Sequence, residues 1–392
     1  MLEQFEYTGG GICAAQGFYA NAIYCGLSEN HDEPDLALIY SDEPCRVALY
    51  TSANKFKGAP LSISTLSVTQ GDVRGILINS KIANCYDYEQ DIHTAGLCVK
   101  SASHVLGGNF LNASAGITNI PLDSENIICN MTDLATNLSL NGSELASRVL
   151  RSNPAVNNQY AVKFNLKGKE CTIGGITSSG AGLDTGYAGN IIIITTDANV
   201  SNSVLSQALK YASRLTFDMK AGRPTVNDMA VALSSRKAGN RPIIINSENY
   251  EIFANSMYWV IQNLTRQMMA SSRGASKLIE CAVSGAYDEH SAKSVAKLTV
   301  NSREVSAALF DPNAGRYDLI FAIGGLGDDF DRNELSVTVS SDLGRYSLMT
   351  NGEFIDYNRD LATVAVSGAE IKILLTIGEG NSTAVAWGSD AV

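Results

Sequence analysis

Residues 191–196 of this 392-residue chain read IIIITT, and this stretch indicates the fold class. Four consecutive β-branched, apolar residues without polar alternation are typical of a strand that is buried on both faces. Such a strand belongs to a sheet that is covered by a layer on each side. Apolar stretches at 36–40 and 75–79 predict further strands, and amphipathic patterns predict helices over 203–211 and from Asn255 onward. We therefore predict a layered α/β fold.

Two local patterns outside this framework lead to further predictions. The apolar segments 361–366 and 370–375 predict two strands joined by a short turn. The acidic group Asp87, Glu89 and Asp91 predicts a solvated turn, because isolated runs of carboxylates usually face water.

The composition excludes several classes of function. A net charge of -11 and a pI near 4.9, without any basic run, argue against a nucleic-acid or anionic-membrane partner. No stretch reaches the ~18 apolar residues that cross a bilayer, and residues 1–6 lack the pattern of a signal sequence. The eight cysteines never form C-x-x-C, and the four histidines lack metal-pair spacing. We expect a cytoplasmic protein with no metal, no cofactor, no nucleic-acid partner and no membrane partner.

Five short motifs follow one another along nearly the whole chain. They are 79–84 (NSKIAN), 114–117 (SAGI), 174–198 (GGITSSGAGLDTGYAGNIIIITTDA), 311–316 (DPNAGR) and 384–390 (AVAWGSD). In order and spacing they resemble motifs of the ornithine acetyltransferase (glutamate N-acetyltransferase) family, among them N-S-G-N-A-N, S-T-G-V and A-T-A-W-G-C-D. The central block of 25 positions matches without a gap.

The resemblance implies an αββα-type sandwich and a precursor that cuts itself before a threonine. In the family, this threonine becomes the N-terminal nucleophile of a second subunit and carries acetyl from N-acetylornithine to glutamate. A hydroxyl beside its own free amine supplies nucleophile and base in one residue, and an oxyanion hole stabilises the tetrahedral intermediate. The halves 1–188 and 189–392 would correspond to the two subunits. We expect them to remain uncut and packed as one body, in a homo-oligomer.

At the positions that match the family's nucleophile and oxyanion hole, this chain carries different residues. The nucleophilic threonine falls on Gly189, which has no side chain, and the lysine eleven residues upstream falls on Ser178. The oxyanion-hole threonine falls on Ala115, whereas its neighbour Gly116 matches the family. The catalytic unit implied by the resemblance is therefore incomplete in this sequence.

The substrate positions differ as well. The family's T-T-D segment falls near Ser152, and the glutamate of D-G-E-G-A-T-K-L falls on Arg273. We interpret the chain as a non-catalytic or repurposed homologue. It would be a structural or regulatory partner, or a binder of a small acylated or acidic metabolite whose carboxylate suits Arg273. The alternative is an active acyltransferase or amide hydrolase with another nucleophile: Thr185, Ser178, Ser179 or a cysteine.

Overall fold

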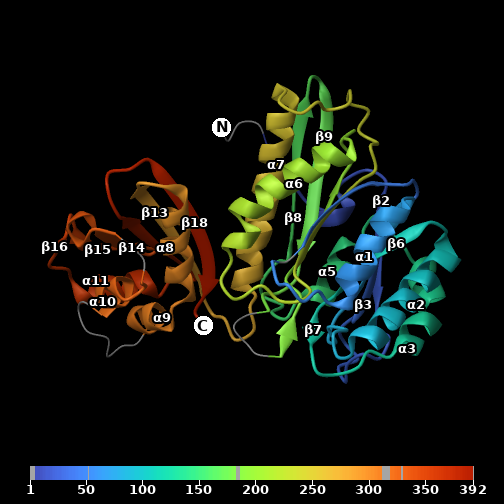
Figure 1. Cartoon of the computed structure of the whole chain (residues 1–392), viewed down its shortest axis with the longest axis horizontal. Coiled ribbons are helices and arrows are strands. Elements are labelled where there is room, and N and C mark those ends of the chain that lie inside the picture. The colour runs from blue at the N-terminus through green and yellow to red at the C-terminus, as the bar shows by residue number, and fades with distance from the viewer. Residues whose placement is uncertain (1–4, 52, 182–185, 311–317, 328–329, 392) are drawn as a thin grey trace. The chain divides into compact units, whose positions relative to one another are not determined.

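The computed structural model describes residues 5–51, 53–181, 186–310, 318–327 and 330–391. The chain divides into two compact units (Figure 1). Unit 1 comprises Met1–Phe217 and Pro224–Ser271, and unit 2 comprises Asp218–Arg223 and Ser272–Val392. The main boundary between the units in sequence therefore lies near residue 271, and the short segment Asp218–Arg223 also belongs to unit 2. The division between residues 188 and 189, which concerns the subunits of the family, stays a prediction.

The first sheet of unit 1 has six strands, with the isoleucine strand in its interior. Its order is β1 (Phe5–Thr8), β8 (Gln159–Leu166), β9 (Lys169–Thr177), β11 (Ile191–Thr196), β12 (Met229–Ser234) and β4 (Arg46–Thr51). Strand β11 pairs antiparallel with β9 and parallel with β12, and all six of its residues are buried. The strand predicted at 191–196 is confirmed. Because β9 and β11 are neighbours, the chain before and after Gly189 contributes to one sheet.

The second large sheet of unit 1 has four strands and contains the two other predicted strands. Its order is β2 (Phe18–Ile23), β3 (Leu36–Ser41), β5 (Val73–Asn79) and β6 (Asn109–Ser114). Strands β3 and β5 confirm the predictions at 36–40 and 75–79. A small ladder joins β7 (Gly116–Ile117) to β10 (Tyr187–Ala188).

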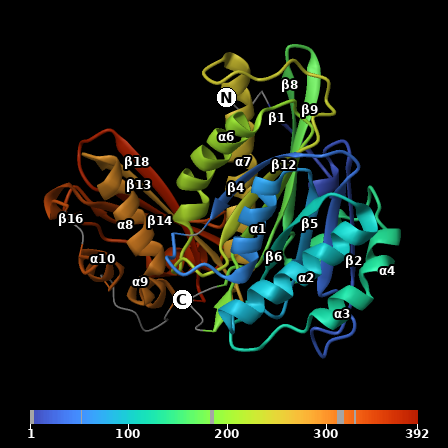
Figure 2. The same ribbon diagram turned by 45° about the vertical axis from the view of Figure 1, so that its right-hand side comes forward.

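Helices cover the outer faces of both large sheets of unit 1 (Figure 2). The longer ones are α1 (Ala59–Gln70), α2 (Tyr88–Leu106), α6 (Asn202–Leu215) and α7 (Glu248–Ala270), and the shorter ones are α3 (Ser124–Cys129) and α4 (Met131–Thr136). The helix α5 (Ser143–Leu150) instead contributes Ala146, Val149 and Leu150 to the core between the two sheets. Helices α6 and α7 lie against the six-stranded sheet, and α1 and α2 lie against the four-stranded sheet.

The cores of unit 1 follow from this layering. Ile39 and Ile78 of one sheet pack with Ile193 and Val231 of the other, which forms a core between the two sheets. A second core lies between the four-stranded sheet and its helices. The predicted αββα-type sandwich is thus confirmed in unit 1. Apolar side chains on both faces of each sheet pack against a neighbouring layer.

The prediction for the long helix of unit 1 is correct in its buried face and wrong in its start. The helix α7 begins seven residues before Asn255, at Glu248, because the Ser247 side chain accepts a hydrogen bond from the Tyr250 N–H. The apolar face expected for it is buried: Met257, Ile261, Leu264 and Met268.

The acidic group of unit 1 is exposed at Asp87 and Glu89, as predicted, but it lies at the start of a helix rather than in a turn, and Asp91 is buried. Asp87 caps α2 through the Gln90 N–H, and Glu89 and Asp91 lie in the first turn of that helix. Asp91 Oδ2 accepts the Asp87 N–H at 2.8 Å, and Asp91 is only 3% exposed. The carboxylates are used at a helix N-terminus, where negative charge is favourable.

Unit 2 is built on another six-stranded sheet. Its order is β16 (Glu353–Phe354), β15 (Arg345–Thr350), β14 (Ser336–Ser340), β17 (Glu370–Thr376), β13 (Leu278–Ala286) and β18 (Ser382–Ser389). Its helices are α8 (Glu289–Asn301), α9 (Arg303–Phe310), α10 (Asp318–Gly324) and α11 (Arg359–Val366). The motif at 384–390 lies largely in β18, where the buried Trp387 donates its indole N–H to Glu280 Oε2 at 2.9 Å. The motif at 311–316 lies outside the described residues.

One strand predicted in unit 2 is wrong. The strand at 370–375 is confirmed as β17, but the segment 361–366 belongs to the helix α11. The Asn358 side chain caps α11 by accepting from two backbone N–H groups, and only Ala365 of this helix is buried. A segment with one buried position and an N-terminal cap forms a helix on the surface, whatever its β-branched content.

Within the part of the chain that the structure describes, no helix has the length and apolar character needed to cross a membrane.

Candidate functional site

The candidate site in unit 1 centres on the backbone at Gly189. Ala188 pairs with Gly116 across the β7–β10 ladder, which brings Gly189 against the residue before Gly116. Gly189 has a φ of 103°, and a Cβ atom at this position would lie 2.7 Å from Ser114 O and 2.8 Å from the Ala115 Cα. Both the left-handed conformation and the close approach therefore require glycine here.

Ser178 bridges the bend at Gly189. Its hydroxyl donates to the Gly189 carbonyl at 3.1 Å and accepts the Ile191 N–H at 2.9 Å. Its own N–H donates to the Ile191 carbonyl at 2.8 Å, and the residue is 1% exposed. The Ser178 hydroxyl is therefore occupied by backbone groups and buried, which does not suit a nucleophile.

Thr225 and Asp228 complete the bend on its other side. The Gly189 N–H donates to Thr225 Oγ1 at 2.9 Å, and the Thr225 hydroxyl donates to Asp228 Oδ1. The same carboxylate oxygen accepts the Asn190 N–H at 3.0 Å and the Asn190 Nδ2 at 2.9 Å. The sequence analysis missed both residues, since a threonine three residues before an aspartate is common in loops.

Gly116 brings two of the quoted motifs together. A Cβ atom at Gly116 would lie 2.1 Å from the Lys81 carbonyl carbon, so the two segments approach closely only because of this glycine. The Ile117 N–H donates to the Lys81 carbonyl at 2.9 Å. Asn227 Nδ2 donates to both the Ala83 and Ser114 carbonyls, at 2.6 and 3.1 Å. Segments 79–84, 114–117 and 225–228 are thereby fixed to one another.

Ala115 offers little to an oxyanion. Its methyl group packs against the core between the sheets. Its N–H donates to the Asn79 carbonyl at 3.1 Å, so this donor is already used. A negatively charged oxygen beside Ala115 would have neither the hydroxyl of the family nor this N–H to bind.

Ser152 and Ser179 form a separate pair in unit 1. The Ser152 N–H donates to Ser179 Oγ at 2.8 Å, and the Ser152 hydroxyl donates to the Ser271 carbonyl at 2.9 Å. The Ser179 N–H donates to the Leu150 carbonyl at 2.9 Å. Ser152 therefore contacts Ser179, which follows Ser178 just after the end of β9.

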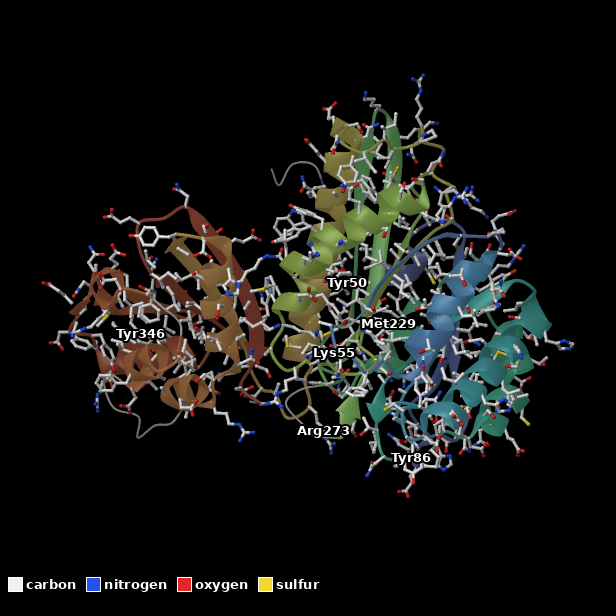
Figure 3. The ribbon with its side chains drawn as sticks, viewed as in Figure 1. Tyr50, Lys55, Tyr86, Met229, Arg273 and Tyr346 are labelled. Carbon is white, nitrogen blue, oxygen red and sulfur yellow. The ribbon has the colours of Figure 1, made fainter. Side chains whose placement is uncertain are left out.

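Arg273 and Met229 are labelled in Figure 3. Met229 begins β12 and donates its N–H to the Asn190 carbonyl at 2.9 Å, which continues the contacts of the bend into the sheet. Arg273 belongs to unit 2, in the connection between α7 and β13. The structure thus brings Ala115, Gly116, Ser178 and Gly189 together in unit 1.

The other nucleophiles weighed from the sequence differ in what the structure says of them. Thr185 lies outside the described residues. Burial raises the pKa of Cys45 and Cys85 to about 11, and that of Cys13, Cys98, Cys171 and Cys281 to about 12. It also raises the pKa of Cys25. These seven thiols stay protonated near neutral pH, and the protonated thiol is a poor nucleophile.

Among the described parts of the chain, no three His, Cys, Asp or Glu side chains gather in an arrangement that could hold a metal ion.

Fold and site together define a class of protein. Two sheets pack face to face between helices, and segments 79–84, 114–117 and 174–198 meet at the Gly189 bend. These features define an α/β protein with the framework of the ornithine acetyltransferases. The chain belongs to the ArgJ family, whose model matches residues 19–392.

Two sequence relatives of similar length agree with this assignment. The arginine biosynthesis bifunctional protein ArgJ of Dehalococcoides mccartyi is 31% identical over 389 residues, which cover 97% of this chain and 94% of that protein. The protein of the same name from Caldanaerobacter subterraneus subsp. tengcongensis is 28% identical over 390 residues, which cover 98% and 96%. The crystal structure of ArgJ from Bacillus halodurans is 28% identical, with a TM-score of 0.46, and the match covers 51% of this chain and 92% of that chain.

Proposed function

We propose that this chain is a member of the ArgJ family that stays uncut and does not use the family's threonine mechanism. The observation that carries the proposal is the backbone at Gly189, with its φ of 103° and the 2.7 Å approach of a Cβ atom to Ser114 O. A residue with a hydroxyl at this position needs a different backbone. Without a hydroxyl at this position, the chain lacks the joint nucleophile and base on which the family's chemistry depends.

The surroundings of Gly189 support the same proposal. Ser178 stands where the resemblance places a lysine, and its hydroxyl holds the bend closed. The Ala115 N–H is taken by the Asn79 carbonyl. When several members of a catalytic unit act jointly, losing one costs nearly as much activity as losing all.

In place of acetyl transfer, the chain would bind a small acylated or acidic metabolite, as a homo-oligomer. Arg273 in unit 2 is the residue proposed for the ligand's carboxylate, since the resemblance places a glutamate there. At ~5 Å and an effective dielectric constant of ~20, an arginine attracts a carboxylate by ~3 kcal/mol, where a glutamate would repel it.

The test compares this chain with an active ArgJ relative in an assay of acetyl transfer from N-acetylornithine to glutamate. We expect no transfer above background from this chain. Calorimetry with N-acetylglutamate should show binding that Arg273→Gln weakens at least tenfold. Transfer at a rate like that of the relative would contradict the proposal.

An acyltransferase or amide hydrolase with another nucleophile has less support. Ser178 is buried and hydrogen-bonded on both sides, and Ser179 accepts the Ser152 N–H. Activity that Thr185→Ala abolishes would revive this alternative.

A further inference from the structure

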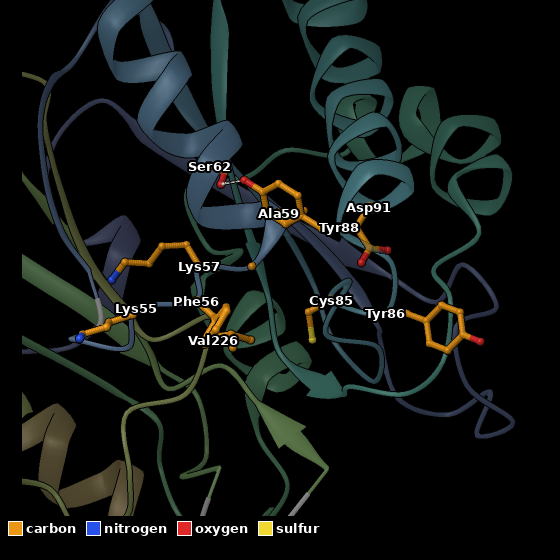
Figure 4. A pocket seen from close by; sticks show the side chains of 11 residues that line it. Lys55, Phe56, Lys57, Ala59, Ser62, Cys85, Tyr86, Tyr88, Asp91 and Val226 are labelled. Carbon is orange, nitrogen blue, oxygen red and sulfur yellow. Dashed lines mark hydrogen bonds between the residues drawn. The ribbon is translucent and has the colours of Figure 1, made fainter.

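Unit 1 contains a cavity whose walls include none of Ala115, Gly116, Ser152, Ser178 and Gly189 (Figure 4). This cavity of about 570 Å³ lies between the loop before α1, the first turn of α1 and the start of α2. Its walls include Phe56, Cys85, Tyr86, Tyr88 and Asp91. The volume falls in the range of pockets that hold small molecules, roughly 300–1,000 Å³, and exceeds what a single inorganic ion needs.

Asp91 is the buried charge of this cavity. The residue is 3% exposed and lines the hollow. One carboxylate oxygen, Oδ2, accepts the Asp87 N–H and so completes the cap of α2. Among the residues that the structure describes, no lysine, arginine or histidine forms an ion pair with Asp91. A carboxylate held out of water without a cation is costly, and burial accordingly raises its pKa.

Three aromatic residues line the same cavity, and two of them present their rings to it. Phe56 is 82% exposed and Tyr88 60%, whereas the ring of Tyr86 points away from Asp91 in Figure 4. The Tyr88 hydroxyl lies 3.3 Å from Ser62 Oγ, which holds its ring over the first turn of α1. Exposed aromatic groups that gather at one hollow mark a binding surface, and ring faces attract cations.

Two lysines, Lys55 and Lys57, also line the cavity, on the side away from Asp91. Figure 4 shows the side chains of Lys55 and Lys57 extending away from Asp91 and Cys85. The positive end of α2 is offset by Asp87, which caps the helix, and by Glu89 in its first turn. The Asp91 side of the cavity is therefore negative and aromatic.

We propose that this cavity binds an organic ammonium ion, with Asp91 as the opposite charge and Tyr88 and Phe56 as walls around the cation. The inference goes beyond the proposed function and does not rest on it, because the cation would be held by Asp91 and aromatic rings, not by Gly189 or Arg273. The cavity borders the bend only through Val226, which lies between Thr225 and Asp228. It assigns the ligand by chemistry: a cationic nitrogen on a small apolar or aromatic body.

The test measures the affinity of the full chain for three aromatic compounds that differ in charge. Tyramine is a cation, 4-ethylphenol is neutral and 3-(4-hydroxyphenyl)propionate is an anion. We expect tyramine to bind about tenfold more tightly than 4-ethylphenol in calorimetry, because it gains both the carboxylate and the ring faces, and we expect no binding of the anion. Equal binding of all three, or a preference for the anion, would overturn the proposal.

Matched variants then locate the effect. Asp91→Asn keeps an oxygen for the Asp87 N–H but removes the charge, so tyramine should bind as weakly as 4-ethylphenol. Glu89→Gln removes an exposed carboxylate from the same helix turn and should leave tyramine binding unchanged. Tyr88→Leu, which leaves Asp91 in place, should also weaken tyramine binding severalfold. Unchanged affinity in both Asp91→Asn and Tyr88→Leu would sink the idea, even if tyramine binds the unmodified chain.

Discussion

The Ser178 hydroxyl donates a hydrogen bond to the Gly189 carbonyl oxygen at 3.1 Å. The Ser178 side-chain oxygen also accepts the Ile191 N–H, so one hydroxyl bridges the chain on both sides of Asn190. The family that this chain resembles has members of its catalytic unit at the positions of Ser178 and Gly189. In this chain the two positions hold a bend together instead.

The first prediction concerns that bridge. Ser178→Ala leaves the Ile191 N–H without the oxygen that accepts it, in a buried place, and an unsatisfied buried donor costs about 1–3 kcal/mol. We expect the free energy of unfolding, measured by urea denaturation, to fall by this amount. Ser179→Ala is the matched control: its oxygen accepts only the exposed Ser152 N–H, so its loss should cost less. Equal losses would show that the bridge adds nothing.

The second prediction separates conformation from crowding at Gly189. Gly186 and Gly189 both have a positive φ, 97° and 103°, but a Cβ atom at Gly186 would meet nothing within 4 Å. Gly186→Ala should therefore cost only the strain of the left-handed backbone, about 1–2 kcal/mol. Gly189→Ala adds the clash with Ser114 and Ala115, so we expect a further ~1–3 kcal/mol. Thermal and urea unfolding of the two variants provides the comparison, and similar values for both would contradict the close approach.

The layered fold follows from local patterns that the sequence displays directly. The strand at 191–196 and the buried face of α7 are visible as an unbroken apolar run and as helical spacing. The segment 361–366 misled because its β-branched residues suggest a strand, whereas Asn358 begins a helix there. The cap residue lies outside the segment 361–366, so the composition of the segment itself does not reveal it.

The contacts of the bend could not be predicted in the same way. Gly189 meets Thr225 across 36 residues of sequence, and Asn190 meets Asp228 across 38. No periodic pattern links a loop threonine or aspartate to such a distant partner. Asp91 was misjudged because a run of carboxylates does not show that one of them turns back to accept the Asp87 N–H at the start of a helix.

The third prediction concerns Asp197, which follows β11. Its carboxylate oxygens accept the Thr172 N–H at 2.8 Å and the Gln16 N–H at 3.1 Å, yet burial raises its pKa above the ordinary 3.8. Between 3.8 and the raised value, the folded chain holds a proton that the unfolded chain lacks. Stability from this group is therefore greatest at acid pH and falls as pH rises through that window.

Asp197→Asn removes this titration and serves as the reference. The unfolding free energy of the unmodified chain minus that of the variant should fall as pH rises from below 3.8 through the raised pKa. The contributions of all other titrating groups cancel in this difference. Urea denaturation across this pH range provides the measurement. A difference that stays constant, or that grows with pH, would show that the carboxylate is not penalised by burial.

The last prediction concerns processing. In the family that this chain resembles, self-cleavage requires a hydroxyl that attacks the preceding carbonyl and converts the peptide bond to an ester. At this position Gly189 offers only hydrogen, so denaturing mass spectrometry should give one species of 41.7 kDa that stays intact on storage and heating. An active ArgJ relative under the same conditions is the control for the method.

Gly189→Thr supplies the missing hydroxyl and should still be neither cut nor active in acetyl transfer. The new side chain would have to adopt a φ of 103° and displace Ser114 O or Ala115, and the Ala115 N–H is already bonded to Asn79. Ser178 would still hold the bend where the resemblance places a lysine. Gly189→Thr should therefore give a less stable, single-species protein. Two fragments from the unmodified chain, with a new N-terminus at Gly189, would show that the position is misassigned; two fragments from Gly189→Thr would show that the hydroxyl alone was missing.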